Sequence, residues 1–223
     1  MNLPGNDKRL SIIGSTGSGK TVAAVFHLSV RDYDRMPWLV YNFKDDRHID
    51  GIPYARHIGV EEIPIKPGVY VAHPTPSDEE TVEAVLHEIW KRQNTGVYVD
   101  EGYMLPHRSP AFRRLLTQGR SRNIPIIVLS QRPVWMDKFV FTESEYFQVF
   151  RLNNMDDRKN VRQFIPREDG EGRPIDLEKR LPKYHSHYYD LGEDKYTKLA
   201  PVPPIDKIHK TFEMRLAHKK KVV

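Results

Sequence analysis

The feature that most constrains this chain is the segment Gly14-Ser-Thr-Gly-Ser-Gly-Lys-Thr21, which fits the pattern G-x-x-x-x-G-K-[ST]. The residues before it, Lys8–Ile13, are predicted to form a short buried strand that ends in the glycine-rich loop. The residues after it, Lys20 to about Val30, carry apolar side chains at helical spacing. A glycine-rich turn between a strand and a helix N-terminus surrounds an anion with backbone N–H groups. The segment therefore predicts a phosphate-binding loop.

The residue types within this loop indicate which phosphate it binds. Lys20 can reach the β and γ oxygens of a nucleoside triphosphate, and the Thr21 hydroxyl can ligate Mg²⁺. We therefore expect the chain to bind ATP and magnesium. The nucleotide-binding residues are predicted to be Gly14, Ser15, Thr16, Gly17, Ser18, Gly19, Lys20 and Thr21.

A second motif is the acidic pair in Val97-Tyr-Val-Asp100-Glu101, at the end of an apolar run. Strand ends are where open α/β sheets present their ligand crevice. Asp100 is positioned to hold the magnesium ion, commonly through water, and Glu101 to accept a proton from the attacking water. Together with the phosphate loop, the pair predicts ATP hydrolysis.

A third motif is the apolar strand Ile124–Ser130, which ends in Gln131-Arg-Pro133. A glutamine there can hydrogen-bond the γ-phosphate or the attacking water. Upstream lies a polar loop with two arginines, Arg120 and Arg122. An arginine supplied by a neighbouring subunit can stabilise transition-state charge, and we assign that role to Arg120, with Arg122 as the second candidate.

The order of the predicted elements indicates the fold. Strands alternate with helices from residue 8 to residue 152, a pattern that favours a mostly parallel sheet covered on both faces. We expect an α/β three-layer P-loop fold of the additional-strand, RecA-like type. The sequence predicts a core over residues 1–152. The C-terminal extension at 153–223 should contain a hairpin, a terminal helix and a basic tail.

Composition excludes several classes of protein. The 223 residues are 39% hydrophobic and 29% charged, which is typical of a folded globular chain rather than a disordered one. The absence of cysteine excludes disulfides and thiolate metal sites. We expect no membrane span, since the apolar runs are too short. The net charge of +5 is compatible with nucleic-acid binding without establishing it.

The segments GSTGSGKT, VYVDE and GRSRNIPIIVLSQRP together resemble the FtsK–HerA superfamily of ring-forming DNA-translocating ATPases. The single-domain size is most similar to the genome-packaging ATPases of tailless, membrane-containing icosahedral viruses. The resemblance implies that Glu101 is the catalytic base, Gln131 the sensor and Arg120 the trans arginine. It also implies a hexameric ring, double-stranded DNA as partner, capsid-vertex or viral membrane proteins as further partners, and location in the host cytoplasm or at the virion packaging vertex.

Two other functions remain open from the sequence. The first is a filamentous-phage-type assembly ATPase that extrudes DNA. The second is a small nucleotide kinase, for which a lid could be supplied by Arg151, Arg158, Arg162 and Arg167.

The DNA-contacting residues cannot be identified from the pattern, although basic candidates exist. These candidates are Lys44, Arg47, Arg56, His57, Lys138 and the tail Lys219–Lys221. No spacing among the ten histidines predicts a metal site, and Asp45–Asp46 are interpreted as a solvated loop or helix cap.

Overall fold

The computed structural model describes residues 3–179 and 181–217, and it is built around one nine-stranded sheet. The strand order is β3-β4-β2-β5-β6-β1-β7-β8-β9. The strands are β1 (Arg9–Ile13), β2 (Pro37–Asn42), β3 (Arg56–His57), β4 (Gly68–Ala72), β5 (Gly96–Asp100), β6 (Ile126–Ser130), β7 (Tyr146–Val149), β8 (Ser186–Asp190) and β9 (Lys195–Leu199).

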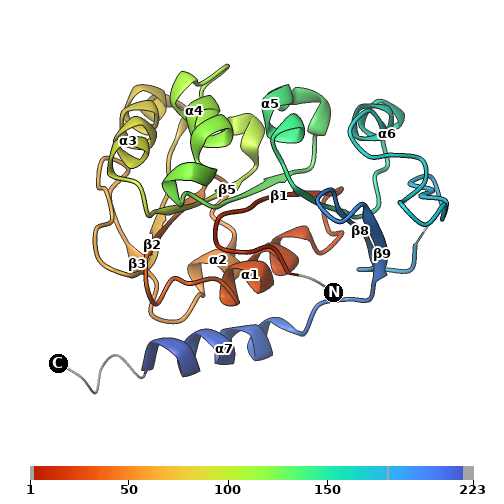
Figure 1. The fold of residues 1–223 in the computed structure, drawn as a ribbon. Coiled ribbons are helices and arrows are strands. Elements are labelled where there is room, and N and C mark those ends of the chain that lie inside the picture. Colours follow the sequence, from red (N-terminus) through yellow and green to blue (C-terminus); the bar gives the residue numbers. More distant parts are fainter. Residues whose placement is uncertain (1–2, 180, 218–223) are drawn as a thin grey trace.

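Helices cover both faces of the sheet and produce three layers (Figure 1). The helices are α1 (Lys20–Ser29), α2 (Arg47–Asp50), α3 (Glu79–Arg92), α4 (Pro110–Gln118), α5 (Lys138–Thr142), α6 (Met155–Arg162) and α7 (Ile205–Ala217). In Figure 1, α3, α4, α5 and α6 lie above the sheet, and α1, α2 and α7 lie below it. Single 3₁₀ turns follow several strands or flank helices, at Pro76–Asp78, Gly102–Met104, Arg120–Arg122 and Pro133–Trp135.

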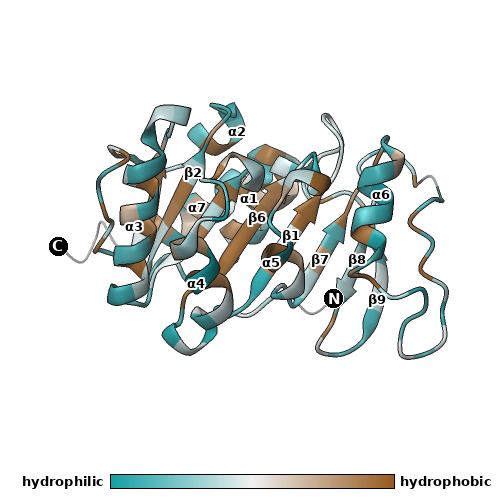
Figure 2. Ribbon diagram, turned by 90° about the horizontal axis from the view of Figure 1, so that it is seen from above, coloured by the Kyte–Doolittle hydropathy of each residue, from teal (hydrophilic) through white to brown (hydrophobic). Residues whose placement is uncertain are grey.

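Successive side chains along each central strand point to opposite faces of the sheet, and this alternation divides the core into two clusters. Val97 and Val99 of β5 pack with α3 and α4, whereas Tyr98 packs on the opposite face with α1. The strands carry most of the apolar residues, and the outward faces of the helices are polar (Figure 2). A sheet that is buried on both faces needs near-continuous apolar strands, and this requirement explains why the strands could be found in the sequence.

The parallel register determines where the site forms. Strands β1 to β7 are mutually parallel, so their carboxyl ends meet at one edge of the sheet. β6 lies between the P-loop strand β1 and the acidic strand β5. This is the additional-strand arrangement that the sequence predicted.

The C-terminal segment continues the same sheet and also covers α1. β8 pairs antiparallel with β7, and β9 pairs antiparallel with β8. Phe212 of α7 is fully buried and stacks on Tyr33, with ring centroids 5.0 Å apart. Arg215 donates to the carbonyl of Ser29 at the end of α1 (3.0 Å). The division of the chain at residue 152 stays a prediction, and the lysine tail lies outside the described residues.

Most predicted elements are confirmed, with shifted ends. The strand predicted at Ile124–Ser130 begins at Ile126, and the strand predicted at Lys8–Ile13 begins at Arg9. The short elements α2, β3 and α5 have too few residues to produce a periodic signal. In the described part of the chain, no helix has the length and apolar character needed to cross a membrane.

Candidate active site

The glycine-rich loop connects β1 to α1 and is held at the carboxyl edge of the sheet. Gly17 and Gly19 have φ angles of 73° and 97°, a left-handed conformation that favours glycine. The N–H of Gly14 donates to the carbonyl of Ser130 (3.1 Å), and that of Ser15 donates to the carbonyl of Arg151 (3.0 Å). The loop is thereby anchored to the ends of β6 and β7, with the N-terminus of α1 behind it.

The acidic pair reaches the same edge, as predicted. Asp100 is the last residue of β5, and Glu101 follows it with a φ of 65°. Lys20 Nζ lies 3.4 Å from Glu101 Oε1. Lys20 and both acids are buried. The structure therefore joins two motifs that lie 80 residues apart in the sequence.

Both carboxylate oxygens of Glu101 accept hydrogen bonds. Oε2 accepts the backbone N–H of Gln131 (2.9 Å), while Oε1 accepts from Lys44 Nζ (2.8 Å). Glu101 is fully buried, so its charge is stabilised by Lys44 and Lys20 rather than by solvent. These contacts fix the side chain in one orientation beside the phosphate loop.

Lys44 lies in the candidate site, where the sequence did not predict it. We considered it only as a DNA contact, yet its ammonium group lies within the site. Lys44 follows β2, and β2 is the hydrogen-bonded neighbour of β5. A signal did exist, because Lys44 is a lysine placed just after a core strand. Its pairing with Glu101 depends on strand order, which the sequence pattern does not specify.

Asp100 has the features expected of a metal ligand. Its Oδ1 is buried and has no hydrogen-bond partner among the residues that the structure describes. Burial, together with the nearby charge of Glu101, raises the pKa of Asp100 to about 7, against an opposing effect of Lys20. A buried carboxylate oxygen without a donor is satisfied by a bound cation. Asp100, with the hydroxyl of Thr21 on the first turn of α1, fits Mg²⁺.

Gln131 connects the end of β6 to the phosphate loop. Its Oε1 accepts from the hydroxyl of Thr16 (2.5 Å), and its Nε2 donates to the hydroxyl of Tyr103 (3.2 Å). The same residue donates its backbone N–H to Glu101. Gln131 therefore contacts both the phosphate loop and the predicted base.

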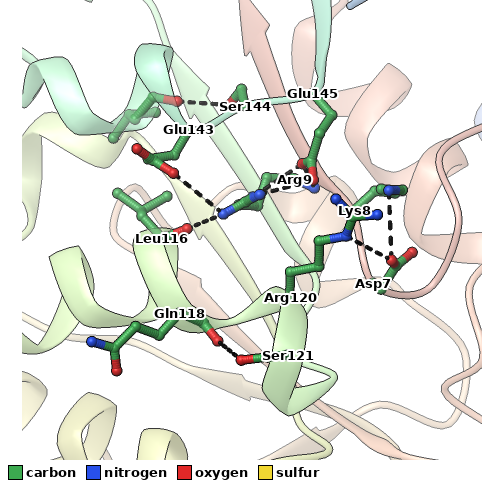
Figure 3. Close-up of polar contacts among 11 residues, drawn as sticks. Asp7, Lys8, Arg9, Leu116, Gln118, Arg120, Ser121, Glu143, Ser144 and Glu145 are labelled. Atoms are coloured by element: carbon green, nitrogen blue, oxygen red, sulfur yellow. Dashed lines mark hydrogen bonds and ion pairs between the residues drawn. The ribbon is translucent and has the colours of Figure 1, made fainter. Parts of the chain in front are cut away.

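Arg120 is not brought to this site. It begins the turn before β6, whereas Gln131 follows β6, so the two residues lie at opposite ends of one strand. Five residues of strand separate these ends by about 13 Å. Arg120 instead pairs with Asp7 (3.5 Å), beside Lys8 and Arg9 at the amino end of β1 (Figure 3). Its side chain is 62% exposed.

Arg122 is held within its own subunit. Its guanidinium stacks on the ring of Trp90 (4.0 Å to the centroid) and donates to the Trp90 carbonyl (3.3 Å). The structure thus distinguishes the two arginines that the sequence left as alternatives. Arg120 is the more exposed of them and the freer to contact a neighbour.

Two pockets flank the phosphate loop and share one aromatic residue. One is lined by Ser15–Ser18 and by Leu181–His185, and the other by Gly17, Gly19–Val22 and Pro201–Ile205. Tyr184 lines both and is 45% exposed. Its ring approaches Gly19, where an added Cβ would lie 3.1 Å away. A partly exposed aromatic ring thus lies beside the phosphate loop, with Lys183 Nζ 4.7 Å from its centroid.

The arginines considered as a kinase lid are partly engaged elsewhere. Arg162 donates to the backbone carbonyls of Ile175 (2.6 Å) and Pro166 (3.1 Å). Its guanidinium therefore supports the loop after α6 rather than facing an acceptor site.

The DNA-contact candidates occupy several different positions. Lys44 belongs to the active site, and Arg56 lies against the ring of Tyr70 and donates to its hydroxyl (3.0 Å). His57 is stacked on His73. Arg47 and Lys138 are near the carboxyl edge, on α2 and α5.

A sequence relative was found at a high level of identity. The chain is 44% identical over 225 residues to the DNA packaging ATPase P9 of Enterobacteria phage PRD1, and the alignment covers 96% of each protein. A search of family models gave no match.

Solved structures share the fold at low identity. The genome packaging NTPase B204 of Sulfolobus turreted icosahedral virus 2, in complex with AMPPCP, superposes with a TM-score of 0.68 and 17% identity, covering 89% of this chain and 100% of B204. ATPases 2 and 3 of EssC from Geobacillus thermodenitrificans superpose with a TM-score of 0.65 and 10% identity, covering 97% of this chain and 45% of EssC. These solved structures share the fold of this chain.

Proposed function

Since this chain belongs to the viral DNA-packaging ATPases of the FtsK–HerA superfamily, we propose that it hydrolyses ATP to drive double-stranded DNA into a preformed capsid. The observation that carries the proposal is the convergence of Lys20, Glu101 and Gln131 at one edge of the sheet. These residues supply a phosphate-binding cation, a base and a contact to the phosphate loop. ATP hydrolysis needs each of these parts.

Hydrolysis follows from the position of Glu101. Its carboxylate is held by Lys44 and by the Gln131 N–H, and it accepts a proton from the water that attacks the γ-phosphate. Lys20 exchanges its contact with Glu101 for the β and γ oxygens of ATP, a change that leaves Lys44 as the cation beside the base. Burial strengthens these electrostatic interactions by excluding water.

Magnesium is the cofactor that fits the residues present. The Thr21 hydroxyl and the Asp100 carboxylate, directly or through water, would hold it beside the phosphates. When bound, the ion neutralises charge that develops on the phosphate oxygens. Its charge also offsets the cost of ionising buried Asp100.

Gln131 is proposed to report the state of the γ-phosphate. Thr16 lies in the loop that wraps the phosphates, and Gln131 accepts from its hydroxyl. A shift of that loop on hydrolysis changes this hydrogen bond and hence the position of the segment after β6. The segment continues into Pro133–Trp135, where Arg132 lies over the Trp135 ring (4.1 Å) and pairs with Asp157 of α6 (3.3 Å).

Arg120 is proposed to complete the site of a neighbouring subunit in a hexameric ring. It lies at the edge of the sheet opposite the phosphate loop of its own chain and is largely exposed. In a head-to-tail ring, the carboxyl edge of one subunit can face such a surface of the next. The guanidinium then stabilises transition-state charge that Lys20 alone does not cover.

Tyr184 is proposed to bind the adenine base. It lies between the two pockets that border the phosphate loop, with its ring near Gly19. Stacking of a base on an aromatic side chain contributes about 1–3 kcal/mol. The assignment is supported by the position of the ring in both pockets and its 45% exposure, with Lys183 Nζ 4.7 Å from its centroid.

The cellular setting follows from the same family. The motor is proposed to act in the host cytoplasm and at the packaging vertex of the virion, and to contact capsid or viral membrane proteins there. Its DNA contacts are to phosphates, so binding should be independent of sequence and should weaken steeply with salt.

The test is an ATPase assay in the presence of different effectors. Rates are measured with protein alone, with duplex DNA, with single-stranded DNA and with a panel of nucleoside monophosphates. Stimulation by duplex DNA supports a packaging motor, and stimulation only by single strands would favour an extrusion ATPase. Stoichiometric phosphate transfer to a monophosphate would replace the proposal with a kinase. Lys20→Ala serves as the inactive control.

A further inference from the structure

Two histidines and an aspartate converge where β3, β4 and α2 meet, with β2 between this cluster and the acidic strand β5. His57 ends β3, His73 follows β4, and Asp50 ends α2. One ligand atom from each residue lies within 4.8 Å of the others. Three segments of the chain that the sequence separates are thus joined at one point.

The spacing of these atoms matches the edges of a metal coordination tetrahedron. His73 Nε2 lies 3.3 Å from His57 Nδ1 and 3.4 Å from Asp50 Oδ1. In a tetrahedral site with metal–ligand distances of about 2.0–2.1 Å, neighbouring ligand atoms are about 3.3–3.4 Å apart. Two edges of the cluster therefore already have the length that zinc requires.

The partners of the cluster orient its ligand atoms. Asp45 Oδ1 lies 2.7 Å from His73 Nδ1, and this contact places the ring proton on Nδ1 and leaves the Nε2 lone pair directed at the cluster. Asn42 Nδ2 donates to Asp50 Oδ1 (2.9 Å) and fixes that carboxylate. A carboxylate behind a ligating histidine is the usual outer shell of a protein metal site.

We propose that Asp50, His57 and His73 bind a divalent transition metal ion of the zinc type. Two imidazoles and one carboxylate suit zinc, cobalt or nickel and do not suit magnesium, which requires oxygen ligands. Three protein ligands leave a fourth position for water. His57 is exposed, and His73 and Asp50 are each about one-third exposed, so the ion can enter from solvent.

The site would connect the segment after β2 to the edge of the sheet. That segment runs from Lys44, which contacts Glu101, through Asp45 to Asp50. A bound ion ties α2 to β3 and to the end of β4. Because the ion binds the folded chain, it stabilises that chain by mass action.

The experiment uses full-length protein without a polyhistidine tag, treated with chelator and then dialysed into buffer containing millimolar Mg²⁺. Co²⁺ is added while visible absorption is recorded, and Zn²⁺ is then added to displace it. We expect one equivalent of Co²⁺, an intense tetrahedral d–d band, and full loss of that band with one equivalent of Zn²⁺. The melting temperature should rise with Zn²⁺.

Variants distinguish the cluster from scattered histidines. His57→Ala and His73→Ala should each abolish the band, and His48→Ala, a histidine on α2 outside the cluster, should retain it. Asp45→Gly removes the carboxylate behind His73 at a position whose φ of 51° suits glycine. It should weaken binding about 10–100-fold, the usual effect of removing an outer-shell partner.

Circular dichroism verifies that each variant is folded, and exposed His57 makes His57→Ala the variant least able to disturb the core. The proposal is overturned if the wild-type protein gives no cobalt band in the presence of Mg²⁺. It is equally overturned if folded His57→Ala binds cobalt as the wild type does, since the ion would then be held elsewhere.

Discussion

The ammonium group of Lys44 lies 2.8 Å from Oε1 of Glu101, nearer than Lys20 Nζ at 3.4 Å. Two lysines thus share one buried carboxylate, and only Lys20 belongs to the phosphate loop. In the proposed mechanism Lys20 turns to ATP, and Lys44 remains beside the Glu101 carboxylate. We therefore propose Lys44 as a positioning residue for Glu101.

The first prediction concerns Lys44. Lys44→Met should lower kcat by about 10-fold or more, a part of the 10²–10⁴-fold that a general base supplies, because it removes a cation that orients the Glu101 side chain. KM for ATP should change little, whereas Lys20→Ala should abolish binding. Steady-state ATPase kinetics measure both parameters. A Lys44→Met enzyme with normal kcat would show that Lys20 alone positions the base.

The second prediction concerns Asp100, whose pKa is raised to about 7 by burial and by the charge of Glu101. Between pH 4 and 7 the folded chain keeps a proton that the unfolded chain loses, so this residue makes stability fall as pH rises. Asp100→Asn should therefore raise the melting temperature at pH 8, without nucleotide or metal, while abolishing hydrolysis. Thermal melts at pH 5 and pH 8 give the comparison. A lower melting temperature at pH 8 would mean that the carboxylate is not a destabilising charge.

The third prediction concerns the base pocket. Tyr184→Ala should raise the Kd for ATP about 10-fold, which corresponds to the 1–3 kcal/mol of a stacked base. Tyr184→Phe keeps the aromatic face and should bind as the wild type does. Binding of ATP and of inorganic triphosphate by calorimetry separates base from phosphate. If Tyr184→Ala weakened the binding of ATP and of inorganic triphosphate equally, Tyr184 would contact the phosphates rather than the base.

The fourth prediction concerns Arg120. Arg120→Ala should leave ATP binding nearly intact while lowering turnover by about 10³–10⁵-fold, as for other arginines supplied in trans. Glu101→Gln should also be inactive. Mixed rings of the two variants should partly recover activity, because some interfaces combine an intact Glu101 with an intact Arg120.

Mixed assembly is verified by differential labelling before activity is measured. If mixed rings form and remain inactive, the trans role of Arg120 is excluded. Arg122→Ala is the matched control, and because Arg122 packs on Trp90 of its own chain, its main effect should be on stability.

The fifth prediction concerns acid stability. Burial lowers the pKa of His27 to about 4, even though its ring donates to Gln148 (2.7 Å), and the charge of Arg31 acts in the same direction as burial. From pH 6.5 down to about 4 the unfolded chain binds a proton that the folded chain does not, so stability falls as pH falls. His27→Gln should reduce the slope of the unfolding free energy against pH by about 1.4 kcal/mol per pH unit.

Urea denaturation at several pH values between 4.5 and 7 measures the slope of His27→Gln against the wild type. Subtracting the slope of the variant from that of the wild type removes the opposite contribution of Asp100, because both proteins contain this residue. Parallel slopes would show that His27 is not the group responsible.

Local chemistry made much of this protein readable from its sequence. Backbone wrapping of phosphate requires glycines, so Gly14–Thr21 specified the loop, and its strand and helix neighbours specified the α/β fold. Strands buried on both faces are apolar runs, so β5 and β6 were found together with the polar residues that end them. Asp100, Glu101 and Gln131 were therefore placed correctly at the carboxyl edge.

Only the tertiary structure decided which side chains from distant segments meet. Strand order put β2 beside β5 and brought Lys44 to Glu101, and it put His57 and His73 side by side at the carboxyl ends of the neighbouring strands β3 and β4. Strand direction placed Arg120 at the edge opposite its own phosphate loop. Periodicity reports which face of an element is buried but not which element lies beside it, because lateral pairing is set by packing across the whole sheet.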